Sequence, residues 1–374
     1  MIASATTALV TGTTGNLGAL FAVRHMRAGG RVIAPVRTRS GGRDIAVRRV
    51  MRSMTRLGVA EREVLAFRER GQLLAYEADL ASGPILADCL ERASVDSIWH
   101  FASSLKYMPR DRDLIHEVNV AALRRLLVEV EQQLPRGVRF NYISTAYIAG
   151  RSDSHLPEAP VELSETRRYT NEYEASKHIA ENLVLDHVRD LGLDAVIYRP
   201  SIVVGATDTH LLANFNGFYL SLYALRSVKH YIEQAGRSGE AIRVGVDAGA
   251  ELNLIPIDLA VDRMRALDMT SPEPGSVFNI ANSLGFKSRD AVTAVAEALA
   301  LRLVAVAPGC FDDAPKTRIE KLLTYGFNYI MPYTNRSFHF AQSRSTERLG
   351  EPVCFDFSNG RIGPFIDEYL RRNR

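Results

Sequence analysis

Residues 8–18 read Ala-Leu-Val-Thr-Gly-Thr-Thr-Gly-Asn-Leu-Gly, and this stretch decides the fold. Its apolar start predicts a strand, and the amphipathic pattern over Leu17–Ala28 predicts a helix directly after the glycines. Glycines in a strand-to-helix turn let backbone N–H groups approach a phosphate at the helix N-terminus. The spacing is GxxGxxG rather than GxGxxG, and an ordinary turn could also hold three glycines. The place of the turn in the chain favours a dinucleotide-binding loop. Its candidate residues are Gly12, Thr14, Gly15, Asn16, Leu17 and Gly18.

Strand and helix patterns alternate outward from this loop through the first 205 residues. The predicted strands are Ala8–Thr11, Arg31–Val36, Leu73–Glu77, Ser97–Phe101, Arg139–Ser144 and Ala195–Tyr198. The predicted helices are Leu17–Ala28, Arg43–Leu57, Ile85–Arg92, Asp113–Leu134 and Tyr173–Leu191. This alternation predicts an α/β fold with a doubly wound parallel sheet of the Rossmann type, because parallel strands need helical crossovers.

The alternation stops after Gly205, so we expect two parts in the chain. Residues 1–205 form the predicted nucleotide-binding core, and a strand near 277–281 returns to its sheet. Residues 206–276 and 282–374 form a predicted insertion and a mostly helical C-terminal cap, which together bind the substrate. Aromatic side chains at Phe215, Phe218, Tyr219 and Tyr223 have helical spacing, which fits either core packing or an apolar substrate wall.

Composition excludes several classes of protein. The formal charge of +3, from 46 basic and 43 acidic residues, is too small to indicate nucleic-acid binding. No apolar run reaches the roughly 20 residues that span a bilayer, and the first residues lack a signal-peptide pattern. The three cysteines are far apart and the nine histidines have no metal-binding spacing, so we expect a cytoplasmic protein without a metal site.

The end of the second predicted strand indicates which dinucleotide binds. Many dinucleotide-binding folds place a carboxylate there to hold the adenosine ribose, but this strand ends in Arg37 and no carboxylate comes before Asp44. A guanidinium suits a 2′-phosphate. We therefore expect NADP, held by Arg37 and more weakly by Arg48, although most of the seven arginines in residues 37–56 fit a solvated helix face.

Tyr173 and Lys177 are four residues apart and share one face of a predicted helix. A nearby ammonium favours phenolate over phenol and lowers a tyrosine pKa that is ordinarily about 10, so the tyrosine can exchange a proton with a carbonyl oxygen. Chance alone gives about 0.2 such pairs in this composition. Ser144 and Thr145 end the fifth predicted strand, at the edge where α/β sheets bind ligands, although such hydroxyls are also common in turns.

These elements together resemble the extended short-chain dehydrogenase/reductases over about the first 205 residues. The matching elements are Thr11–Gly18, Asp79-Leu80, His100–Ser103, Asn119-Val120, Ser144-Thr145, Tyr173–Lys177 and Arg199-Pro200-Ser201. The resemblance implies that Thr145, Tyr173 and Lys177 are catalytic. It also assigns Asp79 and Leu80 to the adenine side of the cofactor site. The remaining cofactor-binding assignments are Ala102, Ser103, Ser104, Tyr173, Lys177 and Pro200. Ser103 departs from the family, where many members have alanine.

Within that family the chain looks most like the fatty acyl-CoA reductase and thioester reductase branch. The likeness rests on Val36-Arg37, Ile143–Tyr147, Asn171–Lys177, Ala180-Glu181, Tyr198–Val204 and Leu252–Asp258. It implies reduction by NADPH of an acyl thioester, carried by CoA or an acyl-carrier protein, to an aldehyde or alcohol. It leaves open whether the chain is a monomer or a homodimer.

Other activities on the same scaffold are alternative hypotheses. A ketone or aldehyde reductase and a nucleotide-sugar epimerase or dehydratase use the same tyrosine and lysine, although Arg37 speaks against an epimerase. A redox-sensing binding protein typically loses the tyrosine and the lysine, and both are present here. Arg226, Arg237 and Arg243 are candidates to meet a phosphate of the substrate carrier.

Overall fold

Seven parallel strands form the central sheet of the computed structural model, which describes residues 6–38, 43–151, 155–237, 239–327 and 331–373. The strand order is β12-β7-β5-β4-β1-β2-β3. The chain adds β2 and β3 on one side of β1, and then adds β4, β5, β7 and β12 on the other side. The strands are β1 (Thr7–Thr11), β2 (Arg31–Val36), β3 (Leu73–Glu77), β4 (Ser97–His100), β5 (Arg139–Ile143), β7 (Ala195–Pro200) and β12 (Ser276–Ile280). This arrangement confirms the predicted doubly wound sheet.

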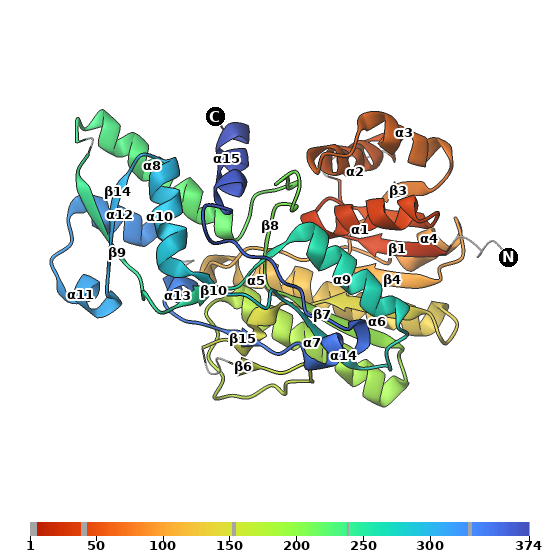
Figure 1. Cartoon of the computed structure of the whole chain (residues 1–374). Helices are drawn as coiled ribbons and strands as arrows, with labels where there is room; N and C mark the ends of the chain where they lie inside the picture. Colours follow the sequence, from red (N-terminus) through yellow and green to blue (C-terminus); the bar gives the residue numbers. More distant parts are fainter. Residues whose placement is uncertain (1–5, 39–42, 152–154, 238, 328–330, 374) are drawn as a thin grey trace.

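Helices cover both faces of the sheet because its strands are buried on both sides (Figure 1). Three helices and their neighbours share one hydrophobic core: α1 (Asn16–Arg27), α2 (Arg43–Arg56) and α9 (Ile257–Met269). Three others share the second core: α4 (Leu86–Leu90), α6 (Ala122–Gln133) and α7 (Glu172–Leu191). The ends of β1 and β4 therefore lie at the topological switch point, where such sheets bind ligands.

A second lobe lies beside the sheet and is built from the insertion and the C-terminal residues (Figure 1). It contains α8 (Phe218–Gln234), α10 (Ser288–Ala298), α11 (Pro308–Asp313) and α12 (Arg318–Phe327), with β9 (Ala241–Gly245) pairing in parallel with β14 (Arg302–Val306). Shorter elements are β6 (His155–Leu156), β8 (Ile202–Val204), β10 (Glu251–Leu252), β11 (Leu254–Pro256), β13 (Phe286–Lys287), α13 (Met331–Thr334), β15 (His339–Phe340), α14 (Ser343–Leu349) and α15 (Gly363–Arg372).

The structure differs from the predicted elements in several places. Helix α3 (Glu61–Glu69) had no counterpart in the prediction, and β14 adds a strand to the region expected to be mostly helical. The single helix predicted over Asp113–Leu134 is divided into α5 (Arg112–His116), a π-helical turn (Glu117–Ala121) and α6. A π-helical turn keeps the helical pattern of apolar residues, so periodicity alone does not reveal it.

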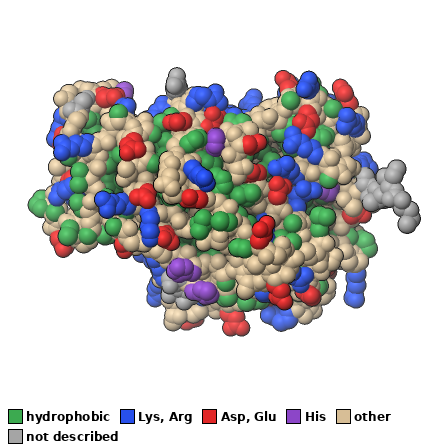
Figure 2. Space-filling view, viewed as in Figure 1, with side chains coloured by type: hydrophobic (Ala, Val, Ile, Leu, Met, Phe, Trp, Pro, Cys, Tyr) green, Lys and Arg blue, Asp and Glu red, His purple; other side chains and the backbone are tan. Residues whose placement is uncertain are grey.

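Charged side chains of both signs are interspersed over the face shown in Figure 2. Within the described ranges, no helix combines the length and apolar character that a membrane span requires.

Candidate active site

A cavity of about 660 Å³ lies at the carboxyl ends of the central strands and contains the predicted site residues. Sixteen predicted residues line it: Gly12, Thr14, Gly15, Asn16, Leu17, Gly18, Arg37, Asp79, Leu80, Ala102, Ser103, Ser104, Thr145, Tyr173, Lys177 and Pro200. Arg48 is the exception, because it is exposed outside the lining, and its neighbour Arg49 lines the cavity instead.

The glycine loop is shaped as a cradle for a phosphate. Gly12 has φ +74°, and a Cβ atom there would lie 2.7 Å from the Ala102 nitrogen. A Cβ at Gly18 would lie 2.5 Å from the Gly12 carbonyl oxygen. Neither position accepts a side chain without a backbone shift, and the bare loop begins α1 at the cavity edge. These residues fit the pyrophosphate of a dinucleotide.

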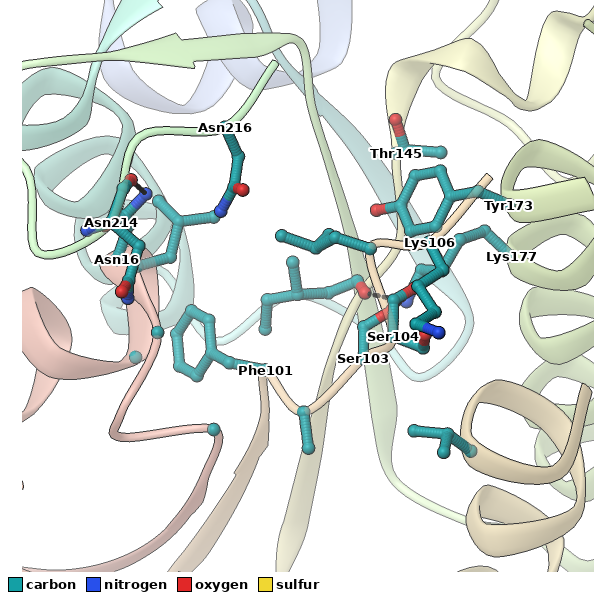
Figure 3. Close-up of a pocket in the computed structure, with 18 of the residues that line it drawn as sticks. Asn16, Phe101, Ser103, Ser104, Lys106, Thr145, Tyr173, Lys177, Asn214 and Asn216 are labelled. Atoms are coloured by element: carbon teal, nitrogen blue, oxygen red, sulfur yellow. Dashed lines mark hydrogen bonds between the residues drawn. The ribbon is translucent and has the colours of Figure 1, made fainter. Parts of the chain in front are cut away.

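Asn214 of the insertion is hydrogen-bonded to this loop, and the sequence did not predict a role for this residue. The Asn16 side-chain amide donates to the Asn214 carbonyl at 2.7 Å, and the Asn214 backbone N–H donates back to Asn16 Oδ1 at 2.8 Å. Asn214 Nδ2 also donates to the Thr14 carbonyl at 3.1 Å. Figure 3 shows this contact on the side of the cavity opposite Thr145, Tyr173 and Lys177. The insertion therefore contributes directly to the cofactor end of the site.

At the end of β2, Arg37 and Arg49 are side by side in the cavity wall, and the Arg49 guanidinium donates to the Arg37 carbonyl. A carboxylate also stands nearby. Glu77 ends β3 opposite Val36 and accepts a hydrogen bond from the Thr38 hydroxyl. The sequence reasoning considered only the end of β2, so it overlooked a charge that the next strand brings to the same place.

Asn119, which lies in the π-helical turn, is hydrogen-bonded to the cavity-lining residues Ser103 and Ser104. Its Oδ1 accepts from the Ser104 N–H at 2.6 Å and from the Ser103 hydroxyl at 3.1 Å. Its Nδ2 donates to Ser176 Oγ at 2.9 Å. Asn119 thereby joins the loop after β4 to helix α7. Ser103 uses its hydroxyl in this link, which an alanine could not do.

Thr145, Tyr173 and Lys177 come together on one side of the cavity (Figure 3). Asn171 caps α7 by accepting from the Glu174 N–H at 3.0 Å, which places Tyr173 and Lys177 on consecutive turns. Lys177 is buried, donates from Nζ to the Ile143 carbonyl at 2.5 Å and lies 4.3 Å from the Tyr142 ring centroid. Burial lowers the pKa of Lys177 to about 7, and the nearby Glu181 carboxylate acts in the opposite direction.

Behind Lys177, a fully buried ion pair joins Glu181 of α7 to Arg199 of β7. Arg199 also donates to the carbonyl of Pro157 at 2.9 Å and to that of Ala159 at 3.0 Å. These bonds satisfy a charge that would otherwise be costly to bury. The pair fixes helix α7 against the sheet.

Glu174 and Tyr333 connect the cap to the active-site helix. The buried Tyr333 hydroxyl donates to the Glu174 carboxylate and accepts from Asn171 Nδ2 at 2.9 Å. Burial raises the pKa of Glu174 to about 7, although hydrogen bonds from Tyr333 and Thr170 act to lower it. Both Glu174 and Tyr333 line the cavity, and neither was predicted.

The aromatic residues of the insertion form core rather than a substrate wall. Phe218 and Tyr219 are buried, the Phe215 ring packs edge-on against Tyr219, and Tyr223 is exposed. None of these four residues lines the cavity, whereas Leu220 of the same helix does. Of the two alternatives that the helical spacing left open, core packing holds for Phe215, Phe218 and Tyr219.

The arginines expected to meet a carrier phosphate also lie outside the cavity lining. Arg243 is paired with Glu320 at 2.7 Å and Arg237 with Glu240 at 2.6 Å. Among the described residues, no cluster of three His, Cys, Asp or Glu side chains could hold a metal ion.

Residues 10–264 match the family model described as "Male sterility protein", which is a model of NAD-binding proteins. Among curated proteins, sterol demethylase protein B of Methylococcus capsulatus is 30% identical over 209 residues, which are 54% of this chain and 53% of that protein. The chain thus spans about half the length of this relative. It spans 3% and 11% of two much longer synthases that it also matches.

Solved structures share the fold at low sequence identity. The terminal R domain of the myxalamid PKS-NRPS pathway has a TM-score of 0.76 at 19% identity, with 100% of this chain and 92% of that chain covered. A thiolation-reductase di-domain from an archaeal non-ribosomal peptide synthetase has a TM-score of 0.73 at 18% identity, with 99% and 76% covered. UDP-glucuronic acid 4-epimerase from Bacillus cereus, with NAD bound, has a TM-score of 0.64 at 15% identity, with 98% and 100% covered.

The family match extends from the first strand through helix α9 and includes the glycine loop, Thr145, Tyr173 and Lys177. It agrees with the resemblance seen in the sequence and with a cavity lined by the glycine loop, Thr145, Tyr173 and Lys177. The chain therefore belongs to the male sterility protein family, whose model is one of NAD-binding proteins, in agreement with its resemblance to the extended short-chain dehydrogenase/reductases.

Proposed function

We propose that the chain reduces an acyl thioester, bound to CoA or to an acyl-carrier protein, with NADPH as the reductant. The observation that carries this proposal is the meeting of Thr145, Tyr173 and Lys177 in one cavity with the glycine loop, in a chain of this family. The likeness to the reductase domains of two carrier-based assembly pathways supports a thioester over a free acid.

The arginine residues near the end of β2 support a preference of the chain for NADPH over NADH. Arg37 and Arg49 line the cavity there, and a pair of guanidinium groups suits a 2′-phosphate. Glu77 stands nearby but lies outside the cavity lining and is engaged by the Thr38 hydroxyl. Asp79 lies beyond the end of β3, in the cavity wall, where it suits the adenine.

Bound NADPH supplies the hydride. Tyr173 donates a proton to the carbonyl oxygen of the substrate, and the Thr145 hydroxyl holds that oxygen. Lys177 in its ammonium form stabilises the tyrosine phenolate that results, and it suits the nicotinamide ribose hydroxyls as a donor. The hydride adduct of a thioester then expels thiolate, so that one thioester, one hydride and one proton give one aldehyde and one thiol.

Part of the cavity wall is apolar. Leu105 and Leu114 line the cavity and are 53% and 43% exposed, and Ile202, Val203 and Leu220 also belong to its lining. Side chains of this kind suit a hydrocarbon chain better than a sugar, because they offer contact area without hydrogen-bonding groups. Product release as aldehyde or further reduction to alcohol depends on how long the aldehyde is held.

The alternatives are a ketone or aldehyde reductase and a nucleotide-sugar epimerase or dehydratase. A comparison of substrate classes distinguishes them. The purified chain is incubated with NADPH and, separately, with acyl-CoAs, acyl-carrier proteins, aldehydes and ketones, while absorbance at the nicotinamide band is followed. UDP-sugars are incubated with the chain and oxidised NAD, because an epimerase or dehydratase first oxidises the sugar, and their conversion is followed by product analysis. We expect oxidation of NADPH with acyl thioesters. Oxidation with simple ketones or aldehydes alone, or conversion of a UDP-sugar without net oxidation, would replace the proposal with the corresponding alternative.

A further inference from the structure

Two buried hydroxyls in the wall of the cavity have no hydrogen-bond partner. Ser144 is 2% exposed and Ser201 is 7% exposed, and the Oγ atom of each is unpaired. Among the described cavity-lining residues, these two alone have a buried side-chain polar atom without a partner. A buried hydroxyl in this state is costly, so a group that fills the cavity is expected to satisfy it.

Each serine follows the end of one of two neighbouring strands, and in their register Ser144 stands level with Arg199, two residues before Ser201. Ser144 directly follows β5 and Ser201 directly follows β7, and these strands are paired in parallel. Their backbones are already fixed, because the Ser144 N–H donates to the Tyr198 carbonyl at 2.7 Å and the Ser201 N–H donates to the Ile280 carbonyl at 3.0 Å. The hydroxyls are therefore the groups that remain for a ligand.

The position of the pair relative to the catalytic residues indicates which ligand group they meet. Ser144 precedes Thr145, and Lys177 donates to the carbonyl of Ile143, the residue before Ser144. Ser201 follows Pro200, which the family resemblance places at the cofactor. The substrate oxygen has Tyr173 and Thr145 as its partners, so the serines are left for the ring that delivers the hydride.

We propose that the hydroxyls of Ser144 and Ser201 bind the carboxamide of the nicotinamide ring. A carboxamide presents one carbonyl acceptor and two N–H donors, and a hydroxyl can serve either kind of group. One serine donates to the carbonyl and the other accepts from the amide N–H. Two contacts of this kind fix the rotation of the carboxamide and select the ring face that is turned to the substrate. The inference rests on the nicotinamide cofactor and does not depend on the thioester.

The test is the dissociation constant for NADPH, measured by fluorescence titration without any substrate. Ser144→Ala and Ser201→Ala are each expected to weaken binding about threefold to tenfold, the usual effect of one hydrogen bond. Ser276→Ala is the matched control, because Ser276 is buried and its hydroxyl is also unpaired, but it lies outside the cavity lining. It should leave NADPH binding unchanged.

A cofactor analogue identifies the ligand group. In 3-acetylpyridine adenine dinucleotide phosphate a methyl group replaces the amide nitrogen, so one of the two proposed contacts is lost. The double variant Ser144→Ala/Ser201→Ala should therefore lose less affinity for the reduced analogue than for NADPH. Equal losses for both cofactors would overturn the proposal. Unchanged NADPH binding, together with a raised KM for the acyl substrate, would also overturn it by moving the hydroxyls to the substrate.

Discussion

Glu174→Gln should change the pH dependence of stability. Burial raises the pKa of this carboxyl from its ordinary 4.5 to about 7. A tenfold change in proton affinity corresponds to about 1.4 kcal/mol, so the whole difference amounts to about 3 kcal/mol. Because the folded protein holds the proton more tightly than the unfolded chain, this contribution to stability is present below pH 4.5 and is lost as the pH rises through 7. Glutamine is always neutral, so the variant does not undergo this loss.

Urea unfolding at pH 5 and pH 8 measures the effect. The free energy of unfolding of Glu174→Gln, taken relative to the unmutated chain, should increase by up to about 3 kcal/mol between the two values. Glu172→Gln is the control on the same helical turn, because Glu172 is partly exposed and lies 3.5 Å from Arg112 and 3.6 Å from His116. It should show less than about 1 kcal/mol of difference. The same relative stability of Glu174→Gln at both pH values would refute the reasoning.

Three further changes test the cofactor site and the active site. Arg37→Ala should weaken NADPH binding about tenfold to a hundredfold and leave NADH binding nearly unchanged, as measured by fluorescence titration; equal constants for both cofactors in the unmutated chain would remove the basis of the preference. Gly18→Ala should abolish cofactor binding, because its Cβ would lie 2.5 Å from the Gly12 carbonyl oxygen. Gly15→Ala should have a milder effect, because its Cβ would lie 3.2 Å from the same atom. Equal effects of the two variants in the same titration would contradict the loop geometry. Tyr173→Phe should reduce kcat at least a hundredfold while NADPH still binds and the melting temperature is kept, because only the proton donor is removed; turnover at the unmutated rate would exclude the assigned acid.

The glycine loop and the helix that carries Tyr173 and Lys177 could be predicted because their information is local. Gly12, Gly15 and Gly18 lie within the single segment 12–18. Tyr173 and Lys177 lie one helical turn apart. The parallel direction of the strands followed from their alternation with helices, since parallel neighbours need crossovers.

Contacts between residues far apart in the chain could not be predicted, because they leave no local pattern in the sequence. Asn214 meets Asn16 across 198 positions, and Tyr333 meets Glu174 across 159 positions. An asparagine in an irregular segment or a tyrosine in a short helix has no periodic signal that marks it. Phe215, Phe218 and Tyr219 had helical spacing that fits either core or channel, and the packing of the lobe decided for the core.

The transfer of a labelled hydride tests the central claim most directly. The chain is incubated with an acyl-CoA and with NADPH that carries deuterium at the transferable position of C4, and thiol release and product mass are followed together. We predict one free thiol for each NADPH oxidised when the product is the aldehyde, or for every two NADPH when it is the alcohol, with deuterium at the former carbonyl carbon. Neither should occur with Tyr173→Phe. NADPH oxidation without thiol release, or a product without deuterium at that carbon, would contradict hydride transfer to a thioester.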